Sequence, residues 1–171
     1  MKLPDFDSLY SEHYPEICRF CFKRLGNQED AEDLTDESFV KAYLYFDSNR
    51  NTSFRTYIFK IAKNLCLDHY KSKRHRQKTR THTFNADLLI DHSLKTNGDV
   101  LQQEILNALY QCLDNLGEQE QLAIRFHFIE QFAYREIADI IGRSISTVKN
   151  RIESGLKNLQ ICLQKKGIIG S

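Results

Sequence analysis

Residues that interrupt regular structure are scarce in this chain. Its 171 residues include two prolines, seven glycines and no tryptophan. An all-β fold needs many turns, and turns are rich in glycine and proline, so this scarcity argues against an all-β protein. Hydrophobic residues make up 41% and charged residues 27% of the chain, as is typical of globular proteins. The composition therefore favours a folded helical protein.

Long hydrophobic runs are also missing. No segment approaches the ~20 apolar residues that a membrane span needs. The N-terminal segment MKLPDFDSLY lacks the basic and then apolar layout of a signal peptide. We therefore expect a cytoplasmic protein that does not insert into a membrane. Five cysteines, an odd number without an export signal, indicate reduced thiols rather than a disulfide framework.

Metal-binding and catalytic patterns are scarce too. Cys18 and Cys21 form a C-x-x-C motif, which occurs in redox pairs and zinc sites. No second ligand pair stands at zinc-finger spacing, and both cysteines fit the buried face of a helix. A nuclease could use Asp30, Asp33 and Glu37, but no H-x-E or H-E-x-x-H pattern supplies further ligands. No catalytic triad or phosphate loop is recognisable, so we expect no enzymatic activity, no metal and no cofactor.

A large net charge is absent, but the charges are unevenly distributed. The formal net charge is +1. Six acids and no base lie between Glu29 and Glu37, whereas Lys60 to Arg80 contains eight lysines or arginines and the single acid Asp68. The net charge of the whole chain is therefore weak evidence for nucleic-acid binding, and the basic segment from Lys60 to Arg80 is stronger evidence.

The first half of the chain has helical periodicity in three segments. Residues 6–25 predict one bent helix or two short ones, because Pro15 must begin or kink a helix. Gly26 and Asn27 predict a helix end and a new N-cap, followed by a helix to about Phe46. The expected buried stripe of that second helix consists of Ala31, Leu34, Ser38, Ala42 and Phe46. Its other stripe is half acidic and half apolar, with Asp30, Asp33, Glu37, Val40 and Leu44. Such a stripe fits a basic and apolar partner surface, and a solvated acidic face is the alternative.

The third helix is expected from Phe54 to about Arg76, after a loop over residues 47–53. Its buried residues should be Phe54, Ile58, Ile61 and Leu65. A basic stripe runs along another side and contains Lys60, Lys63, Leu67, Lys71 and Arg74. Because Tyr57, Phe59 and Tyr70 are interleaved with it, the pattern suits phosphate contact combined with stacking on unpaired bases.

The second half ends in a pattern typical of a helix-turn-helix. Periodicity is lost over residues 77–98, which we interpret as a linker, and helices are expected at 101–116 and from Leu122 to about Gln131. Within 132–159, Gly142 provides the turn and Ser144 the cap of a second helix, which buries Ile145, Val148, Ile152 and Leu159. Its outer face, with Lys149, Asn150, Glu153, Ser154 and Lys157, fits a DNA major groove. An ordinary helical hairpin is the alternative.

Together the two halves resemble the extracytoplasmic-function (ECF) sigma factors of bacteria. The segments that carry the resemblance are DAEDLTDESFVKAY (30–43), FRTYIFKIAKNLCLDHYKSKRHR (54–76) and YREIADIIGRSISTVKNRIESGLKNL (134–159). The resemblance implies an all-α fold of two small helical domains joined by a flexible linker. Residues 1–76 would form the region 2 domain, 77–98 the linker and 99–171 the region 4 domain, which is a helix-turn-helix domain.

The resemblance also implies a function and partners. A sigma factor is a dissociable subunit that binds core RNA polymerase, directs it to specific promoters and helps open the DNA. The expected partners are promoter DNA and the β′ clamp helices and β flap of the polymerase, with an anti-sigma factor or another DNA-targeting protein as further candidates. The alternative is a helix-turn-helix regulator that is not a polymerase subunit, which would leave the basic helix at 54–76 without a role.

Three sets of site residues follow from the resemblance. The residues expected to bind core polymerase are Asp30, Asp33, Glu37, Phe39 and Val40. The residues expected to bind the minus-ten element are Asn49, Arg50, Asn51, Arg55, Tyr57, Lys60, Lys63, Asn64, Asp68, Lys71 and Arg74. The residues expected to bind the minus-thirty-five element are Arg143, Ser144, Ser146, Thr147, Lys149, Asn150, Arg151, Ser154 and Lys157.

The chain departs from the family pattern at three places in its C-terminal half. Leu116 and Gly117 stand where Leu-Pro is frequent, and Arg143 follows the turn glycine where an apolar residue is common. Glu153 places an acid on the face expected to approach DNA. These departures concern recognition of the minus-thirty-five element rather than the fold, and a polymerase partner or a further DNA-targeting factor could contribute to promoter choice.

Overall fold

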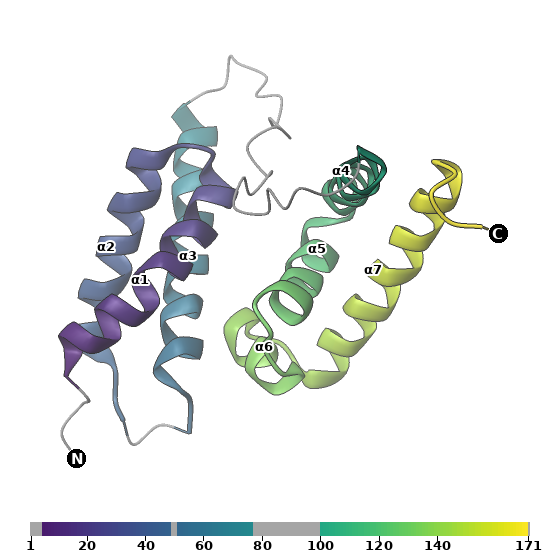
Figure 1. Cartoon of the computed structure of the whole chain (residues 1–171). Coiled ribbons are helices and arrows are strands. Elements are labelled where there is room, and N and C mark those ends of the chain that lie inside the picture. Colours follow the sequence, from purple (N-terminus) through teal and green to yellow (C-terminus); the bar gives the residue numbers. More distant parts are fainter. Residues whose placement is uncertain (1–4, 49–50, 77–99, 171) are drawn as a thin grey trace. The chain divides into compact units, whose positions relative to one another are not determined.

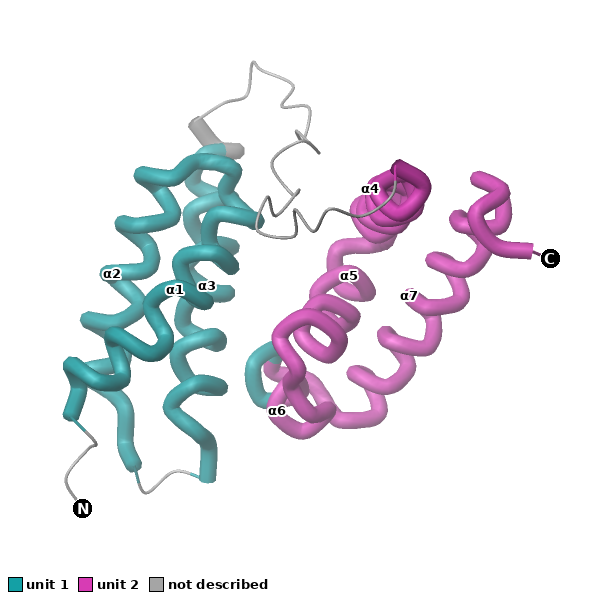
Figure 2. The backbone as a smooth tube through the Cα atoms, in the orientation of Figure 1, with its two compact units in different colours: residues 1–84, 139–141 teal, residues 85–138, 142–171 magenta. Residues whose placement is uncertain are grey.

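The computed structural model describes residues 5–48, 51–76 and 100–170, and the side chains of residues 74–76 are not described. Every regular element within these ranges is a helix (Figure 1), which confirms the predicted all-α fold. The predicted linker at 77–98 lies outside the described residues. The chain divides into two compact units, and Figure 2 colours residues 139–141 with the first of them.

Up to Arg76, the described part of the first unit contains three helices: α1 (Phe6–Leu25), α2 (Gln28–Tyr45) and α3 (Phe54–Arg76). The segment expected as one or two helices is a single helix that includes Pro15. The predicted boundary between α1 and α2 is confirmed. Gly26 adopts a left-handed conformation with φ 68°, and the side chain of Asn27 accepts a hydrogen bond from the backbone N–H of Asp30.

Aromatic rings fill the core of the first unit. Phe39 of α2 is 2% exposed and contacts the rings of Tyr10 and Phe54, with centroids 4.7 and 6.4 Å away. Phe59 of α3 is fully buried and meets Phe20 edge-on at 5.4 Å. The prediction that Phe59, interleaved with the basic stripe, can stack on unpaired bases is therefore wrong. Ile61, expected in the core, is only half-buried. Three helices around one core bury a wider face of α3 than a single apolar stripe indicates.

The cysteines of the first unit belong to its core rather than to its surface. Cys21 of α1 and Cys66 of α3 are buried, and Cys18 is half-buried. Contact with the Cys66 sulfur, together with burial, raises the pKa of the Cys21 thiol well above its usual range. Cys21 therefore stays protonated, as expected for a cysteine that packs as a small apolar residue.

The second unit contains α4 (Val100–Asp114), α5 (Glu118–Ile124), the π-helix η3 (Arg125–Ile129), the first five residues of α6 (Tyr134–Ile141), and α7 (Ile145–Lys165). The helix expected from Leu122 to Gln131 is thus divided into α5 and a π-helical turn. Gly155 of α7 is buried, and a Cβ at this position would lie 2.6 Å from Cδ1 of Ile124. The glycine therefore allows α5 and α7 to approach closely.

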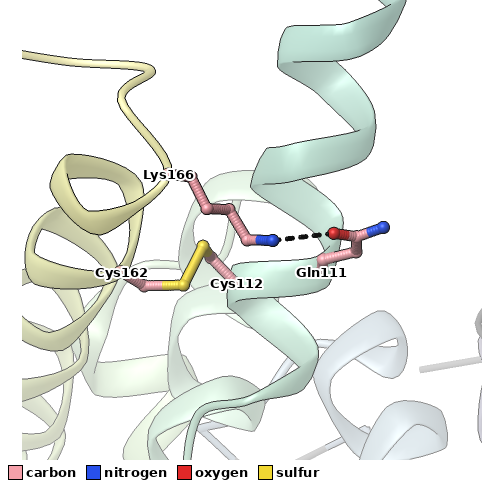
Figure 3. Close-up of a disulfide and its surroundings, with 4 residues drawn as sticks. All are labelled: Gln111, Cys112, Cys162 and Lys166. Carbon is pink, nitrogen blue, oxygen red and sulfur yellow. Dashed lines mark hydrogen bonds between the residues drawn. A yellow bond between two sulfur atoms is a disulfide. The ribbon is translucent and has the colours of Figure 1, made fainter.

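A disulfide between Cys112 and Cys162 joins α4 to α7 (Figure 3). The two Cα atoms are 5.8 Å apart, although 50 residues separate them in the sequence. Next to the disulfide, Nζ of Lys166 donates a hydrogen bond to Oε1 of Gln111 at 2.9 Å. The prediction of reduced thiols is wrong for this pair. The sequence does not reveal which cysteines the fold brings together, and that proximity decides whether a disulfide can form.

Candidate nucleic-acid and partner interfaces

The outer face of α2 carries an exposed patch that is acidic in its first half and apolar in its second. Asp33 and Glu37 are exposed, as are Val40 (57%) and Leu44 (62%). Glu37 also pairs with Lys41 at 2.9 Å, one turn further along the helix. Large exposed apolar side chains grouped in this way are typical of a surface that binds a partner. We call Asp33, Glu37, Val40 and Leu44 the α2 face.

Tyr43 extends the apolar part of the α2 face, and Tyr45 is a second exposed ring at the end of the same helix. Neither was among the residues expected at this face. Their exposed fractions are 59% and 66%. Tyr43 is three residues from Val40, so helical spacing already placed the two side chains on neighbouring positions. This spacing was the signal that could have identified Tyr43.

Asp30 and Phe39 differ from the expected exposed polymerase contacts. Nζ of Lys73 lies 2.6 Å from Oδ2 of Asp30, and Nε2 of His69 lies 3.4 Å from the same oxygen. The hydrogen bond from Lys73 lowers the pKa of Asp30 below its ordinary value. Because Lys73 lies near the end of α3, this contact links the start of α2 to the end of α3. Phe39 is a core residue, and its side chain contacts the interior of the unit rather than its surface.

The basic side of α3 is present in the structure, with different degrees of exposure. Asn64, Asp68, Lys71 and Tyr70 are exposed, whereas Tyr57, Lys60 and Lys63 are half-buried. Asn51, in the preceding segment, is exposed. Asn49 and Arg50 lie outside the described residues, as does the side chain of Arg74. The surface can therefore offer cations and an aromatic ring to a nucleic acid, but Phe59 does not contribute to it.

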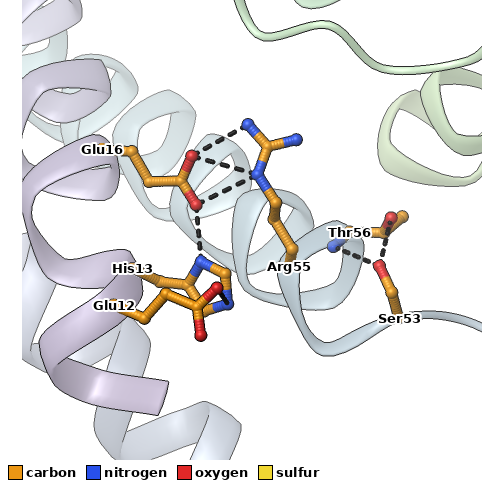
Figure 4. Close-up of polar contacts among 6 residues, drawn as sticks. All are labelled: Glu12, His13, Glu16, Ser53, Arg55 and Thr56. Atoms are coloured by element: carbon orange, nitrogen blue, oxygen red, sulfur yellow. Dashed lines mark hydrogen bonds and ion pairs between the residues drawn. The ribbon is translucent and has the colours of Figure 1, made fainter. Parts of the chain in front are cut away.

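Arg55 is held by a carboxylate of its own unit (Figure 4). Its Nε donates to both oxygens of Glu16 at 3.1 and 3.0 Å, and Nη2 donates to Oε2 at 2.8 Å. Nδ1 of His13 is 2.7 Å from Oε1 of the same glutamate. The Arg55 guanidinium also lies 5.2 Å from the ring centroid of Phe59. Arg55, which the resemblance implies as a DNA contact, therefore joins α3 to α1. Glu16 is the partner that sequence reasoning missed.

The C-terminal helix-turn-helix forms as predicted. Gly142 has a φ of 65°, and Oγ of Ser144 accepts a hydrogen bond from the backbone N–H of Thr147 at 3.1 Å. Val148 and Ile152 of α7 are buried, whereas Ile145, expected in the core, is 51% exposed. The outward side of α7 carries polar side chains one or two turns apart. The exposed ones are Ser146, Lys149, Asn150, Glu153 and Lys157.

The remaining residues predicted to bind the minus-thirty-five element have other surroundings. Oγ of Ser154 donates to Oε1 of Glu120 at 2.5 Å, and Nδ2 of Asn158 donates to Oε2 of the same glutamate at 3.2 Å. Ser154 therefore faces α5, which corrects its assignment to the outward side. Arg151 is half-buried, Ser144 and Thr147 form the cap of α7, and Arg143 is exposed in the turn. Glu120 was not identified from the sequence, because its partners lie 34 and 38 residues away.

None of the helices in the described part of the chain is both long and apolar enough to cross a bilayer.

Comparisons with known proteins match both units. Residues 9–76 match the family model of sigma-70 region 2, and residues 106–159 match that of sigma-70 region 4. The chain is 28% identical over 163 residues to the ECF RNA polymerase sigma factor SigW of Bacillus subtilis, covering 91% of this chain and 87% of SigW. It is 29% identical over 165 residues to the ECF sigma factor SigE of Mycolicibacterium smegmatis, covering 95% of this chain and 63% of SigE.

Two solved structures share the fold. The sigma factor RpoE of Bartonella quintana, in complex with the anti-sigma factor NepR, aligns with a TM-score of 0.68 and 21% identity, covering 95% of this chain and 98% of RpoE. CnrH, in complex with the cytosolic domain of CnrY, aligns with a TM-score of 0.64 and 20% identity, covering 94% of this chain and 88% of CnrH.

The helical fold and its helix-turn-helix define a DNA-binding protein of transcription. With both regions matched in order, the chain belongs to the ECF sigma factors of RNA polymerase. It is a transcription initiation factor that directs the polymerase to promoters. A helix-turn-helix regulator outside the polymerase is not favoured, because residues 9–76 match region 2 as well.

Proposed function

We propose that the surfaces described above divide the work of promoter recognition. The α2 face binds the β′ clamp helices of core polymerase. Residues 47–53 and α3 capture unpaired bases of the minus-ten element, and α7 reads the minus-thirty-five element. Residues 1–76 and 99–171 act as two domains with these separate tasks. The exposed acidic and apolar α2 face is the observation that carries this proposal.

Charge and apolar area both support polymerase binding by the α2 face. Val40 and Leu44 would lose water on binding, and Asp33 and Glu37 would meet basic groups of the partner. A solvated acidic face would not explain why the apolar side chains of Val40 and Leu44 are more than half exposed.

The α3 surface combines the groups that single-stranded DNA needs. Flipping a base out of a duplex costs a few kcal/mol, which stacking and phosphate contacts must offset. Tyr70 offers an exposed ring and Lys71 an exposed cation, with Asn64 and Asp68 on the same helix for polar contacts. We therefore propose this surface as the site of promoter opening, with the polymerase providing the remaining contacts.

The outward side of α7 carries the base-reading groups. Lysine can donate to the acceptors of guanine, and asparagine can form two hydrogen bonds with adenine. Lys149 and Asn150 are both exposed and lie in the second turn after the Ser144 cap. They are our candidates for direct recognition of the minus-thirty-five element, with Arg143, Ser146 and Lys157 near the DNA backbone.

We also propose that the protein works in the cytoplasm with its polymerase and has no catalytic step of its own. The β flap is a second polymerase contact in this proposal, through the second unit. RpoE is bound by an anti-sigma factor in its solved complex. We propose that a partner of this kind, or a further DNA-targeting protein, controls the present chain.

Transcript start mapping with the cognate core polymerase tests the proposal. Adding the protein should create promoter-dependent starts that the core enzyme alone does not make. The isolated protein should leave promoter DNA closed to permanganate. Random starts with the complete enzyme, or permanganate-reactive bases with the protein alone, would contradict the proposed division of work.

A further inference from the structure

Glu153 lies on the same outward side of α7 as the proposed base-reading residues. Its carboxylate Oε1 is 3.8 Å from Nζ of Lys149, one turn earlier, and the two side chains are 62% and 61% exposed. Val148 and Ile152, each one residue earlier in the sequence, are buried on another side of the helix. A carboxylate at this position approaches any DNA that Lys149 reaches.

Contacts between α5 and α7 fix the rotation of α7 about its axis. Glu120 of α5 accepts hydrogen bonds from Ser154 and Asn158, and Gly155 packs against Ile124. These three positions of α7 face α5. Glu153 therefore cannot turn away from the outward side without breaking the contacts of its sequence neighbours.

The chemistry of the major groove restricts what a carboxylate can recognise. Phosphates repel it, so it is tolerated only where it accepts a hydrogen bond from a base. The donors in the major groove are the amino groups of cytosine and adenine. In adenine the amino group stands beside the acceptor N7, which repels a carboxylate, whereas cytosine has no acceptor in the major groove.

We propose that Glu153 selects a cytosine in the upstream promoter element, while Lys149 offsets its charge and contacts a neighbouring guanine. This inference rests on the proposed reading of that element by α7. Four residues advance a helix by about 6 Å, which is roughly two steps of 3.4 Å along one DNA strand. The cytosine and the guanine contacted by Lys149 should therefore lie within about two base pairs of each other.

A promoter library randomised over the upstream element tests the inference. Transcription of the library by the complete polymerase, followed by sequencing, gives the base preference at each position. The wild-type protein should favour cytosine roughly fivefold or more at one position. Glu153→Ala should abolish that preference. Glu153→Gln should move it towards adenine, because an amide can pair with both N6 and N7 of that base.

A matched variant separates base reading from charge. Glu104 is an exposed glutamate of α4, so Glu104→Gln removes the same charge from the same unit and should leave the preference unchanged. Uniformly stronger transcription with both Glu153 variants, at unaltered preference, would mean that Glu153 only repels DNA and would overturn the inference.

Lys149→Ala and Asn150→Ala distinguish failure of the inference from failure of the proposed function. If these variants alter the upstream preference and the Glu153 variants do not, Glu153 is not a reader although α7 reads the element. If none of the four variants alters the preference, α7 does not read bases and both proposals are wrong.

Discussion

At the scale of single residues, the structure separates functional candidates from residues that hold the fold. Asp30 and Asp33 are three positions apart on α2 and look equivalent in the sequence. Asp30 is bound by Lys73, whereas Asp33 is exposed on the α2 face. An acid already paired within the unit is less available to a partner, because the existing contact must first be given up.

Replacing Asp30 should therefore affect stability rather than polymerase binding. Asp30→Asn removes a partly exposed ion pair, and we expect a loss of about 0.5 kcal/mol in the free energy of unfolding. Affinity for core polymerase should stay unchanged, and Asp33→Asn should show the reverse pattern. Chemical denaturation and a polymerase-binding assay on both variants measure the two effects. Weaker polymerase binding by Asp30→Asn at unchanged stability would contradict this assignment.

The stability difference should depend on pH in a defined direction. Lys73 lowers the pKa of Asp30 in the folded protein below its ordinary value of 3.8. The unfolded chain thus binds the proton more tightly, so the contribution of Asp30 is fully present above that value and is lost as the pH falls through the folded-state pKa. The difference between wild type and Asp30→Asn should be largest near neutral pH and shrink in acid.

At the scale of elements, the α2 face should determine affinity for the polymerase. Asp33→Lys combined with Glu37→Lys places like charges against a basic partner surface, which should cost several kcal/mol of binding free energy. Both side chains are exposed, so the helical content should be retained. Affinity for core polymerase and circular dichroism measure the two properties. Undiminished affinity in a folded double variant would exclude this face as the docking site.

The disulfide should stabilise the pairing of α4 and α7. It closes a loop between residues 50 positions apart. The chain-entropy model gives ~4 kcal/mol for a loop of this length. Reduction, or the double change Cys112→Ser and Cys162→Ser, should speed amide hydrogen exchange in α4 and α7 and leave exchange in α1 to α3 unchanged. A reductant should have no further effect on exchange in the double variant. Equal exchange with and without the disulfide would contradict the prediction.

At the scale of the whole molecule, the two units should contribute to DNA binding in different ways. Lys71 is an exposed cation of α3, and as a phosphate contact it should add to open-complex formation on every promoter. In Lys71→Ala, the slope of the logarithm of open-complex formation against the logarithm of salt concentration should be smaller by about one unit. The base preference should not change. Open-complex formation on several promoters at a series of salt concentrations checks this. A promoter-specific loss would instead indicate base reading by Lys71.

Much of the architecture was predictable from the sequence because its causes are local. The end of α1 at Gly26, the cap at Asn27, the span of α3 and the turn at Gly142 all follow from residues within a few positions of each other. The periodic apolar residues of the second half predicted the helix-turn-helix for the same reason. The π-helical turn of η3 was missed, since the apolar pattern of Leu122, Phe126 and Ile129 also fits a continuous α-helix.

By itself the sequence determined the helical class and the outward polar side of α7, because spacing along one helix is enough to define them. It also indicated the family, because segments in both halves of the chain resemble it in the same order. The tertiary structure alone decided which of those candidates are engaged inside the protein. Arg55 pairs with Glu16, Ser154 with Glu120 and Cys112 with Cys162, over separations of 39, 34 and 50 residues. Contacts between helices depend on how their faces pack, and periodicity within one helix carries no information about the partner it meets.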